Sequence, residues 1–313
     1  MGAIPWIDDQ ATFERLVDQL AAAPVYALDT EFHRERTYWP QLGLVQLAGP
    51  AGAALVDPQA VDLTRLADLF EAGGAAVAHA ASQDLEVLEQ ACGALPGALF
   101  DTQLAAGFAG FSSPSLTSLV AAVLDVELAK GDRLTDWTRR PLSDSQKAYA
   151  AADVTHLLDL HAALRLRLAA SGRLAWAEQE CAALLARPRP AQEPGTAWWR
   201  IKESRTMRGQ SRGVAQAVAA WRERRAAEVD RPPRTVLSDL AILGIAHQMP
   251  RTEQALRQVR GIDGRPLGGP ATAAVLAAVE AGRSMPAGEL RRPPVEPLDR
   301  RLRPAVTLVS AWV

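Results

Sequence analysis

Two acidic residues end an apolar stretch near the N-terminus, and their type and spacing suggest chemistry. Residues 25–28 are apolar, and Asp29, Thr30 and Glu31 follow them directly. Residues i and i+2 of a strand point to the same face, so Asp29 and Glu31 should leave a strand together. Carboxylate oxygens are the ligands that hard divalent cations such as Mg²⁺ prefer. The pattern predicts a cation site, while two neighbouring acids are also typical of a solvated surface.

Two further acids and a tyrosine lie where such a site could recruit them. Asp84 follows the predicted strand 75–79 near the start of a predicted helix, and ligand sites form where strands end and helices begin. Asp153 lies in a helix with Tyr149 four residues before it, so the two share a helical face. Taken singly, Asp84 could only complement the helix dipole, Asp153 could be solvated, and Tyr149 could pack against the helix.

The elements that must position these residues can be read from the apolar periodicity. Strands alternate with helices up to about residue 186, which predicts a sheet with helices on its faces. The predicted strands are 25–32, 42–48, 53–56, 75–79 and 98–101. The predicted helices are 8–22, 62–71, 82–91, 102–110, 115–124, one long helix from Ser143 to about Ala170, and 173–186. A Pro-rich segment begins at Arg187, and only short helices follow it, at 213–229, 238–248, 252–260 and 270–281.

Charge is divided unequally between the two halves of the 313-residue chain, a length typical of two domains. Residues 1–196 carry a net charge of −11, and residues 197–313 carry +9, with 19 arginines and one lysine as cations. Guanidinium groups suit phosphate, so the rear half suggests a polyanionic partner. Codon bias would explain the use of Arg over Lys but not its concentration in one half.

Composition also excludes several classes of protein. The chain contains no apolar run of the roughly 18–20 residues that a membrane span needs, and its N-terminus lacks a signal-peptide pattern. Cys92 and Cys181 form neither a disulfide framework nor a metal-ligand spacing, and the five histidines are scattered. We therefore expect a cytoplasmic protein with no membrane partner.

The order of these motifs resembles the ribonuclease D family, the tyrosine-bearing branch of the DEDD 3′→5′ exonucleases. The resemblance rests on Asp29-Thr-Glu31-Phe, His79-Ala-Ala-Ser-Gln-Asp84, Tyr149-x-x-x-Asp153, Leu44-Val-Gln-Leu and the loop from Asp136 to Leu142. It covers about residues 1–185. The rear helices resemble the helical module called HRDC, through Trp221-Arg-Glu-Arg-Arg and Pro232-Pro-Arg.

The resemblance implies an α/β ribonuclease H-like exonuclease domain, a mixed sheet flanked by helices, followed by a small all-α HRDC-like domain. The expected boundaries are 1–186 for the exonuclease domain, 187–210 for the linker and connecting segment, 211–285 for the HRDC domain and 286–313 for a Pro- and Arg-rich tail. Some ribonuclease D proteins carry two such helical modules. Here the apolar run 304–313 suggests a second module that has been cut short.

The resemblance also implies a function, a metal-dependent 3′→5′ exoribonuclease that releases nucleoside 5′-monophosphates. It implies two divalent ions per site, Mg²⁺ or Mn²⁺, held by Asp29, Glu31, Asp84 and Asp153, with Tyr149 orienting the attacking water. The expected partner is RNA with a free 3′ end, such as a tRNA precursor or another structured RNA, and the protein is expected to be a monomer. A DNA 3′→5′ exonuclease, and a non-catalytic nucleic-acid-binding protein on a nuclease fold, are the alternatives.

Further residues are candidates for contact with the substrate. Phe32, Trp39 and Trp137 could stack on terminal bases, and Lys130, Arg139 and Arg140 could meet the phosphate backbone. Each of these aromatic residues could instead be part of the core, and for Phe32 the sequence favours neither possibility over the other. The turn at 259–262 could offer backbone N–H groups to phosphate or could only end a helix.

Overall fold

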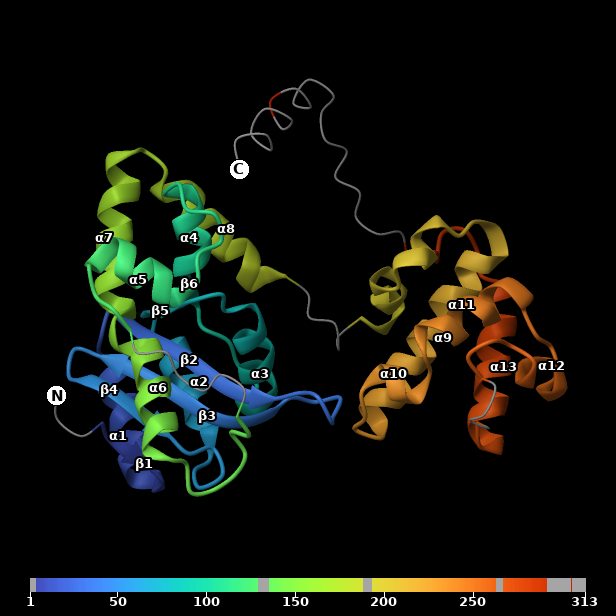
Figure 1. The fold of residues 1–313 in the computed structure, drawn as a ribbon, viewed down its shortest axis with the longest axis horizontal. Coiled ribbons are helices and arrows are strands. Elements are labelled where there is room, and N and C mark those ends of the chain that lie inside the picture. Colours follow the sequence, from blue (N-terminus) through green and yellow to red (C-terminus); the bar gives the residue numbers. More distant parts are fainter. Residues whose placement is uncertain (1–3, 129–134, 188–192, 263–266, 292–304, 306–313) are drawn as a thin grey trace. The chain divides into compact units, whose positions relative to one another are not determined.

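The structure is a computed structural model that describes residues 4–128, 135–187, 193–262, 267–291 and 305. The chain divides into two compact units (Figure 1). We call Met1–Arg34 with Pro40–Arg187 the sheet unit, and Glu35–Trp39 with Pro188–Val313 the helical unit.

The sheet unit is built on one six-stranded mixed sheet. Its strands are β1 (Trp6–Ile7), β2 (Val25–His33), β3 (Gln41–Gly49), β4 (Gly52–Val56), β5 (Ala75–Ala78) and β6 (Ala98–Asp101). They lie in the order β1-β4-β3-β2-β5-β6. The pairs β2–β3 and β3–β4 are antiparallel, and the other three pairs are parallel. The short strand β1, which the sequence did not predict, adds an edge beside β4.

Helices cover both faces of the sheet. Successive side chains of each strand point to opposite faces, and both faces are apolar and must be buried. The helices are α1 (Gln10–Ala21), α2 (Leu66–Glu71, preceded by the short 3₁₀ turn Leu63–Arg65), α3 (Ser82–Cys92), α4 (Thr102–Phe108), α5 (Leu116–Leu124), α6 (Asp144–Thr155), α7 (Leu157–Ala170) and α8 (Leu174–Ala186). Tyr26 and Leu28 of β2 pack with α1, α2 and α3, whereas Ala27 faces the cluster formed with α4, α5 and α7. This confirms the predicted mixed sheet flanked by helices.

The single helix predicted from Ser143 to about Ala170 is in fact two helices. Ser143 begins α6 with a capping box, as its side chain accepts from the backbone N–H of Gln146 while Gln146 reaches back to the Ser143 N–H. The helix breaks at His156, which has φ −105° and ψ 2°. Just before the break, the Thr155 hydroxyl donates to the carbonyl oxygen of Ala151 at 2.6 Å, a local bond that competes with regular helix. The break lets α6 cover β2, β3 and β4 while α7 packs on β2 and β5.

The helical unit is all-α among its described residues. It contains the 3₁₀ segments Pro194–Arg200 and Lys202–Thr206 and the helices α9 (Gly209–Glu228), α10 (Pro233–Val236), α11 (Asp239–Gln248), α12 (Glu253–Arg257) and α13 (Gly269–Arg283). The helices α9 and α13 meet backbone to backbone, since a Cβ on Gly213 would lie 2.2 Å from the carbonyl oxygen of Gly282. Trp198, which falls in the predicted connecting segment, is 1% exposed and belongs to this core.

Two further predictions, a shortened second module and the lack of a membrane span, can be compared only with the described residues. The run 304–313, predicted as a shortened second module, lies outside the described residues except for residue 305. Among the helices of the described segments, none combines the length and apolarity required to cross a membrane.

Candidate active site

The site begins where β2 runs on beyond its parallel neighbour. β5 accompanies β2 only over Val25 to Ala27. The rest of β2, which carries Asp29 and Glu31, therefore lies past the carboxyl end of β5, at the edge of the sheet where α3 starts. On the other side, β2 remains paired with β3, where Asp29 lies opposite Gln46 and Glu31 opposite Leu44. This pairing holds both carboxylates on the face that α6 covers.

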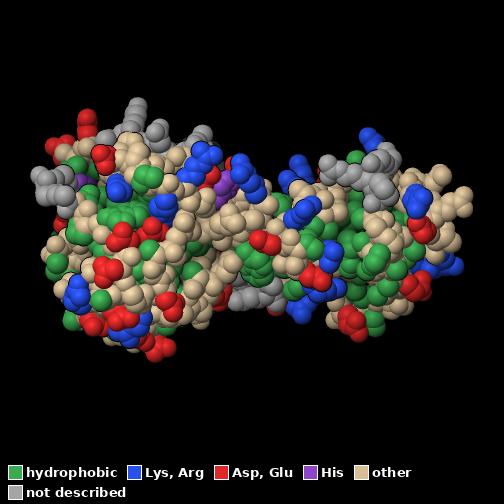
Figure 2. Space-filling model, turned by 90° about the horizontal axis from the view of Figure 1, so that it is seen from below, with side chains coloured by type: hydrophobic (Ala, Val, Ile, Leu, Met, Phe, Trp, Pro, Cys, Tyr) green, Lys and Arg blue, Asp and Glu red, His purple; other side chains and the backbone are tan. Residues whose placement is uncertain are grey.

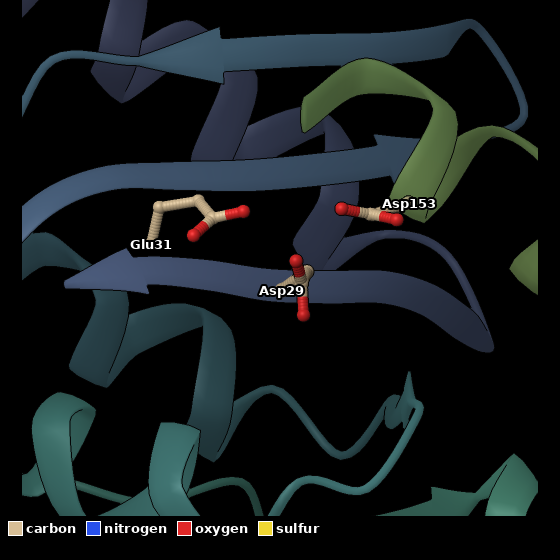
Figure 3. A group of neighbouring side chains, drawn as sticks. All are labelled: Asp29, Glu31 and Asp153. Carbon is tan, nitrogen blue, oxygen red and sulfur yellow. The ribbon is translucent and has the colours of Figure 1, made fainter. Parts of the chain in front are cut away.

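Three carboxylates from two elements meet at this edge. Asp29 and Glu31 come from β2 and Asp153 comes from α6, and each offers an oxygen atom that lies within 4.8 Å of those of the other two. Figure 3 shows the three carboxylates turned toward a common space. Asp153 can approach closely because the neighbouring positions of α6, Ala150 and Ala151, are small and buried.

Asp84 is the fourth acid of the site and reaches it from the start of α3. The Thr30 hydroxyl donates to Asp84 Oδ1 at 2.5 Å, so Asp84 is bonded to the residue between Asp29 and Glu31. All four acids line one pocket of about 800 Å³, together with Tyr149 and Phe32. The four acids of three separated motifs thus converge on a single pocket, although Asp84 stands outside the close group of three.

Asp101 holds the start of α3 in place. Its carboxylate accepts from the backbone N–H groups of Ala80 at 3.1 Å and Ala81 at 2.8 Å, directly before the helix. The same side chain caps α4 by accepting from Gln103 and Leu104. Asp101 was not singled out in the sequence, because one acid at a strand end carries no signal of this double role.

Burial and neighbouring charges shift the pKa values of two acids in the pocket. Burial, followed by the charges of Asp84, Asp153 and Glu31, raises the pKa of Asp29 well above its usual value. Burial raises the pKa of Asp84 to about 6, although the hydrogen bond from Thr30 opposes the shift. Acids that share a pocket without a counter-charge hold their protons more tightly, and they release them when a cation binds.

The residues around the acids supply no counter-charge of their own. Among the described residues that line the pocket there is no Lys or Arg. His79 lines it, but burial lowers the pKa of His79 and favours the neutral ring. The donor set is therefore entirely oxygen-based and strongly negative once ionised, which fits hard divalent cations.

Tyr149 and Phe32 lie at the pocket as predicted. The Tyr149 side chain is half-buried, lines the pocket and lies with its ring 6.1 Å from that of Trp137. Phe32 lines the pocket beside Glu31. Sequence reasoning missed the far wall, formed by Gln103 and the segment Ser113 to Thr117, because nothing in the spacing of that segment points to the pocket.

Two predicted substrate contacts are instead part of the fold. Trp137 is 2% exposed and packs with Leu44, Leu55 and Leu142 beneath α6, so its ring cannot stack on a base from this position. Arg140 donates to both carboxylate oxygens of Asp57, at 2.7 and 2.5 Å, and its guanidinium group is used within the unit.

The remaining predicted contacts lie in three different places. The Arg139 side chain is 84% exposed, with its Nε 3.5 Å from Asp136 Oδ2. Trp39 belongs to the helical unit, where its indole N–H donates to the carbonyl oxygen of Ala227 at 3.2 Å. Lys130 lies outside the described residues.

A mixed sheet that presents clustered carboxylates at its edge, followed by a helical module, defines the class of 3′→5′ exonucleases with an added helical domain. The family model for 3′-5′ exonucleases matches residues 4–169, and the model for the HRDC domain matches residues 211–268.

Individual relatives identify the family within this class. The chain is 42% identical to ribonuclease D of Gluconacetobacter diazotrophicus over 88% of its own length and 71% of that protein. It is 39% identical to ribonuclease D of Acidiphilium cryptum, over 97% of its own length and 78% of that protein. The crystal structure of Escherichia coli RNase D matches with a TM-score of 0.81 at 33% identity, covering 99% of this chain and 83% of that one. The catalytic core of RRP6 from Trypanosoma brucei shares the fold, with a TM-score of 0.63 at 23% identity.

The chain belongs to the ribonuclease D family. It is a 3′→5′ exoribonuclease whose activity depends on divalent metal ions and whose substrate is RNA.

Proposed function

We propose that Asp29, Glu31, Asp84 and Asp153 hold two divalent cations, Mg²⁺ or Mn²⁺, and that this centre hydrolyses RNA from its 3′ end. The observation that carries the proposal is the meeting of four acids in one pocket where no described Lys or Arg compensates them. When bound, a pair of such ions supplies an activated water and stabilises the leaving 3′-oxygen.

The residues of the site then have distinct tasks. Asp29, whose pKa is raised by burial and by all three neighbouring acids, contributes to both cation sites. Glu31 and Asp153 complete the site on the side of the attacking water, and Asp84, held by Thr30, supports the other. The Tyr149 hydroxyl, on the same helical face as Asp153, orients the water by a hydrogen bond.

The substrate has a free 3′ end, and the products are nucleoside 5′-monophosphates. The far wall from Ser113 to Thr117 and the ring of Phe32 border the space in which a terminal nucleotide would lie. Arg139, with its exposed guanidinium, meets the backbone outside the pocket. Because E. coli RNase D is described as an exoribonuclease involved in structured RNA processing, we propose tRNA precursors or other structured RNA as the physiological substrates.

The helical unit adds a second contact with RNA. A pocket of about 670 Å³ there is lined by Trp221, Arg225, Arg231 and Arg234, and no Asp or Glu is among its described lining residues. An aromatic ring beside guanidinium groups suits an unpaired base and its phosphates. On the face drawn in Figure 2, blue basic side chains stand among red acidic ones, so this pocket is a more specific candidate than the general excess of arginine.

Release of mononucleotides from labelled RNA tests the catalytic proposal. A 5′-labelled all-RNA strand should shorten stepwise from its 3′ end in Mg²⁺ and release nucleoside 5′-monophosphates. Chelation, or a blocked 3′ end, should stop the reaction, and an all-DNA strand with a matched end should be degraded much more slowly. Cleavage that survives a blocked 3′ end would contradict the proposed direction of attack.

The salt dependence of RNA binding tests the helical pocket. Replacing Arg225, Arg231 and Arg234 by Ala removes three phosphate contacts, so the slope of log K against log salt should fall by about 2. The control variant replaces the exposed Arg224, Arg251 and Arg257, which do not line the pocket. Equal slopes for the two variants would show that the charge of the unit matters and the pocket does not.

We further propose that residues 1–186 form the exonuclease domain, that 187–210 connect it to an HRDC domain at 211–285, and that one chain acts alone in the cytoplasm. Light scattering at working concentration should give the mass of one chain, 33.5 kDa.

A further inference from the structure

A buried glutamine beside the active site has no hydrogen-bond partner. Gln46 lies in the middle of β3 and is 0% exposed. Neither Nε2 nor Oε1 of its carboxamide has a hydrogen-bond partner in the structure. Buried side-chain amides are almost always hydrogen-bonded, so an unpaired one in the centre of a sheet needs a reason.

The position of Gln46 supplies that reason. It lies directly opposite Asp29 in the antiparallel ladder between β2 and β3. Residues opposite each other in such a ladder project from the same face, with Cβ atoms about 4.5–5.5 Å apart. The carboxamide therefore lies under α6, on the same side of the sheet as Asp29 and Glu31.

Packing holds the side chain at that position. Leu44, two residues earlier on the same face, and Leu55, paired with Gln46 across β3 and β4, are both buried in the apolar cluster beneath α6. Ala150 of α6 belongs to the same cluster and is 0% exposed. An apolar residue would suit this layer better than an amide, because no desolvated polar group would then remain unpaired.

We propose that Gln46 is a positioning residue of the metal centre, whose carboxamide N–H donates to the Asp29 carboxylate when divalent cations are bound. Asp29 is then ionised, and a carboxylate that ligates a metal keeps lone pairs that a neighbouring donor can hold. The bond fixes the orientation of the ligand that we assign to both cation sites. The inference rests on the proposed cation site and concerns a residue outside the four acids.

The test separates metal binding from stability by using Gln46→Met, which has a similar shape and no amide. Titration calorimetry with Mn²⁺, on the full-length protein without RNA, should show affinity reduced by about 10–100-fold. In chelator, the variant should unfold at the same temperature as wild type or a higher one, since no bond of the metal-free state is lost. Leu44→Met, on the same face of β3 and opposite Glu31, is the control and should keep Mn²⁺ affinity within about twofold of wild type.

A direct measurement on wild type does not depend on how the variant folds. With ¹⁵N-labelled glutamine side chains, the amide resonances of Gln46 should shift and exchange more slowly when Mg²⁺ is added. Unchanged resonances, or Mn²⁺ affinity in Gln46→Met equal to that of Leu44→Met, would overturn the role of Gln46. If Asp29→Asn loses Mn²⁺ binding while Gln46→Met keeps it, the metal centre stands and this inference fails; if wild type binds no Mn²⁺, both fail.

Discussion

Asp29 in the sheet unit is a half-buried acid and Glu223 in the helical unit is a buried one, and their surroundings are opposite. Glu223 is 2% exposed and forms an ion pair with Arg200 at 2.7 Å. Asp29 has three acids around it, and they raise its pKa after burial has already done so. The helical unit neutralises its buried charge internally, and the sheet unit leaves a cluster of charge for a ligand to neutralise.

A second acid in the sheet unit shows that this difference belongs to the site and not to the unit. Burial alone would raise the pKa of Asp57, but the hydrogen bonds from Arg140 and from the Gln59 backbone, with the charge of Arg140, hold it below its usual value. The sheet unit thus pairs Asp57 with Arg140 away from the pocket, where the acid has a structural role. Asp29 is surrounded by acids that raise its pKa, and clusters of groups with shifted pKa values are typical of functional sites.

Asp29→Asn should have the largest effect of the variants considered, on both activity and stability. The variant removes the charge that the other three acids repel, so the metal-free protein should unfold at a higher temperature than wild type. Activity on RNA should fall by about three orders of magnitude or more, because a proposed ligand of the catalytic cations is lost. Thermal unfolding in chelator and initial rates in Mg²⁺ check both parts. A variant that is less stable and still active would contradict the assignment of Asp29.

Arg222→Ala should lower the stability of the helical unit while hydrolysis continues, which is the reverse of the effect of Asp29→Asn. Arg222 is 4% exposed and donates to Asp239 and to the carbonyl oxygen of Leu237. Its loss removes the donor to the Leu237 carbonyl oxygen and leaves Asp239 paired with Arg234 alone, so we expect the free energy of unfolding of this unit to fall by about 1–3 kcal/mol. Hydrolysis of a short oligoribonucleotide should continue. The control Arg225→Ala, whose partner Glu228 is on the surface, should cost less than about 1 kcal/mol in urea denaturation.

Asp84→Asn should change the pH dependence of the stability of the sheet unit. The folded pKa of Asp84 is about 6 and its ordinary value is 3.8, so the folded protein binds this proton more tightly than the unfolded chain does. The stability that Asp84 contributes is therefore full below about pH 4 and is lost as the pH rises through 6. The amide that replaces this carboxyl group in the variant can still accept from Thr30 and does not titrate.

The variant should consequently gain stability over wild type as the pH rises from 4 to 7.5, by roughly 2–3 kcal/mol in chelator. Urea unfolding of both proteins at several pH values measures this difference. Taking the difference cancels the contributions of the half-buried histidines His79 and His161, whose lowered pKa values act in the opposite direction. A difference that does not change with pH would contradict the account of Asp84.

Tyr149→Phe should have the smallest effect of the four variants. It removes a neutral hydroxyl from the pocket and leaves every acid in place, so Mn²⁺ affinity and the unfolding temperature should match those of wild type. The rate at saturating RNA should fall by about 10–100-fold if the hydroxyl orients the water. Single-turnover rates with matched metal titrations check this, and a lost affinity for Mn²⁺ would point to a structural role instead.

Local patterns predicted most of the elements and pointed to four acids that line one pocket of the structure, because each motif combines a chemical group with a regular element. The side chains of Asp29 and Glu31 share a face because they lie two apart on a strand, and that rule needs no tertiary information. Asp84 was placed near the site because it follows the predicted strand 75–79, which the structure shows as β5 (Ala75–Ala78). The position alone left open that Asp84 only complements the helix dipole, and the family resemblance favoured the metal site.

Partners far apart in the sequence explain what was predicted wrongly or missed. Arg140 was expected to be free for phosphate, but it pairs with Asp57, which lies 83 residues earlier in the chain. Trp137 in the same polar loop was expected at the substrate, but packing beneath α6 buries it. Gln46 carried no chemical signal in its strand, because its meaning depends on the register between β2 and β3.

Anomalous scattering from crystals grown in Mn²⁺ would test most directly whether the four acids of the pocket form a metal centre. The account predicts two peaks in the pocket, both next to Asp29, with Glu31 and Asp153 around one and Asp84 near the other. Peaks at other carboxylates, with none among these four acids, would contradict it.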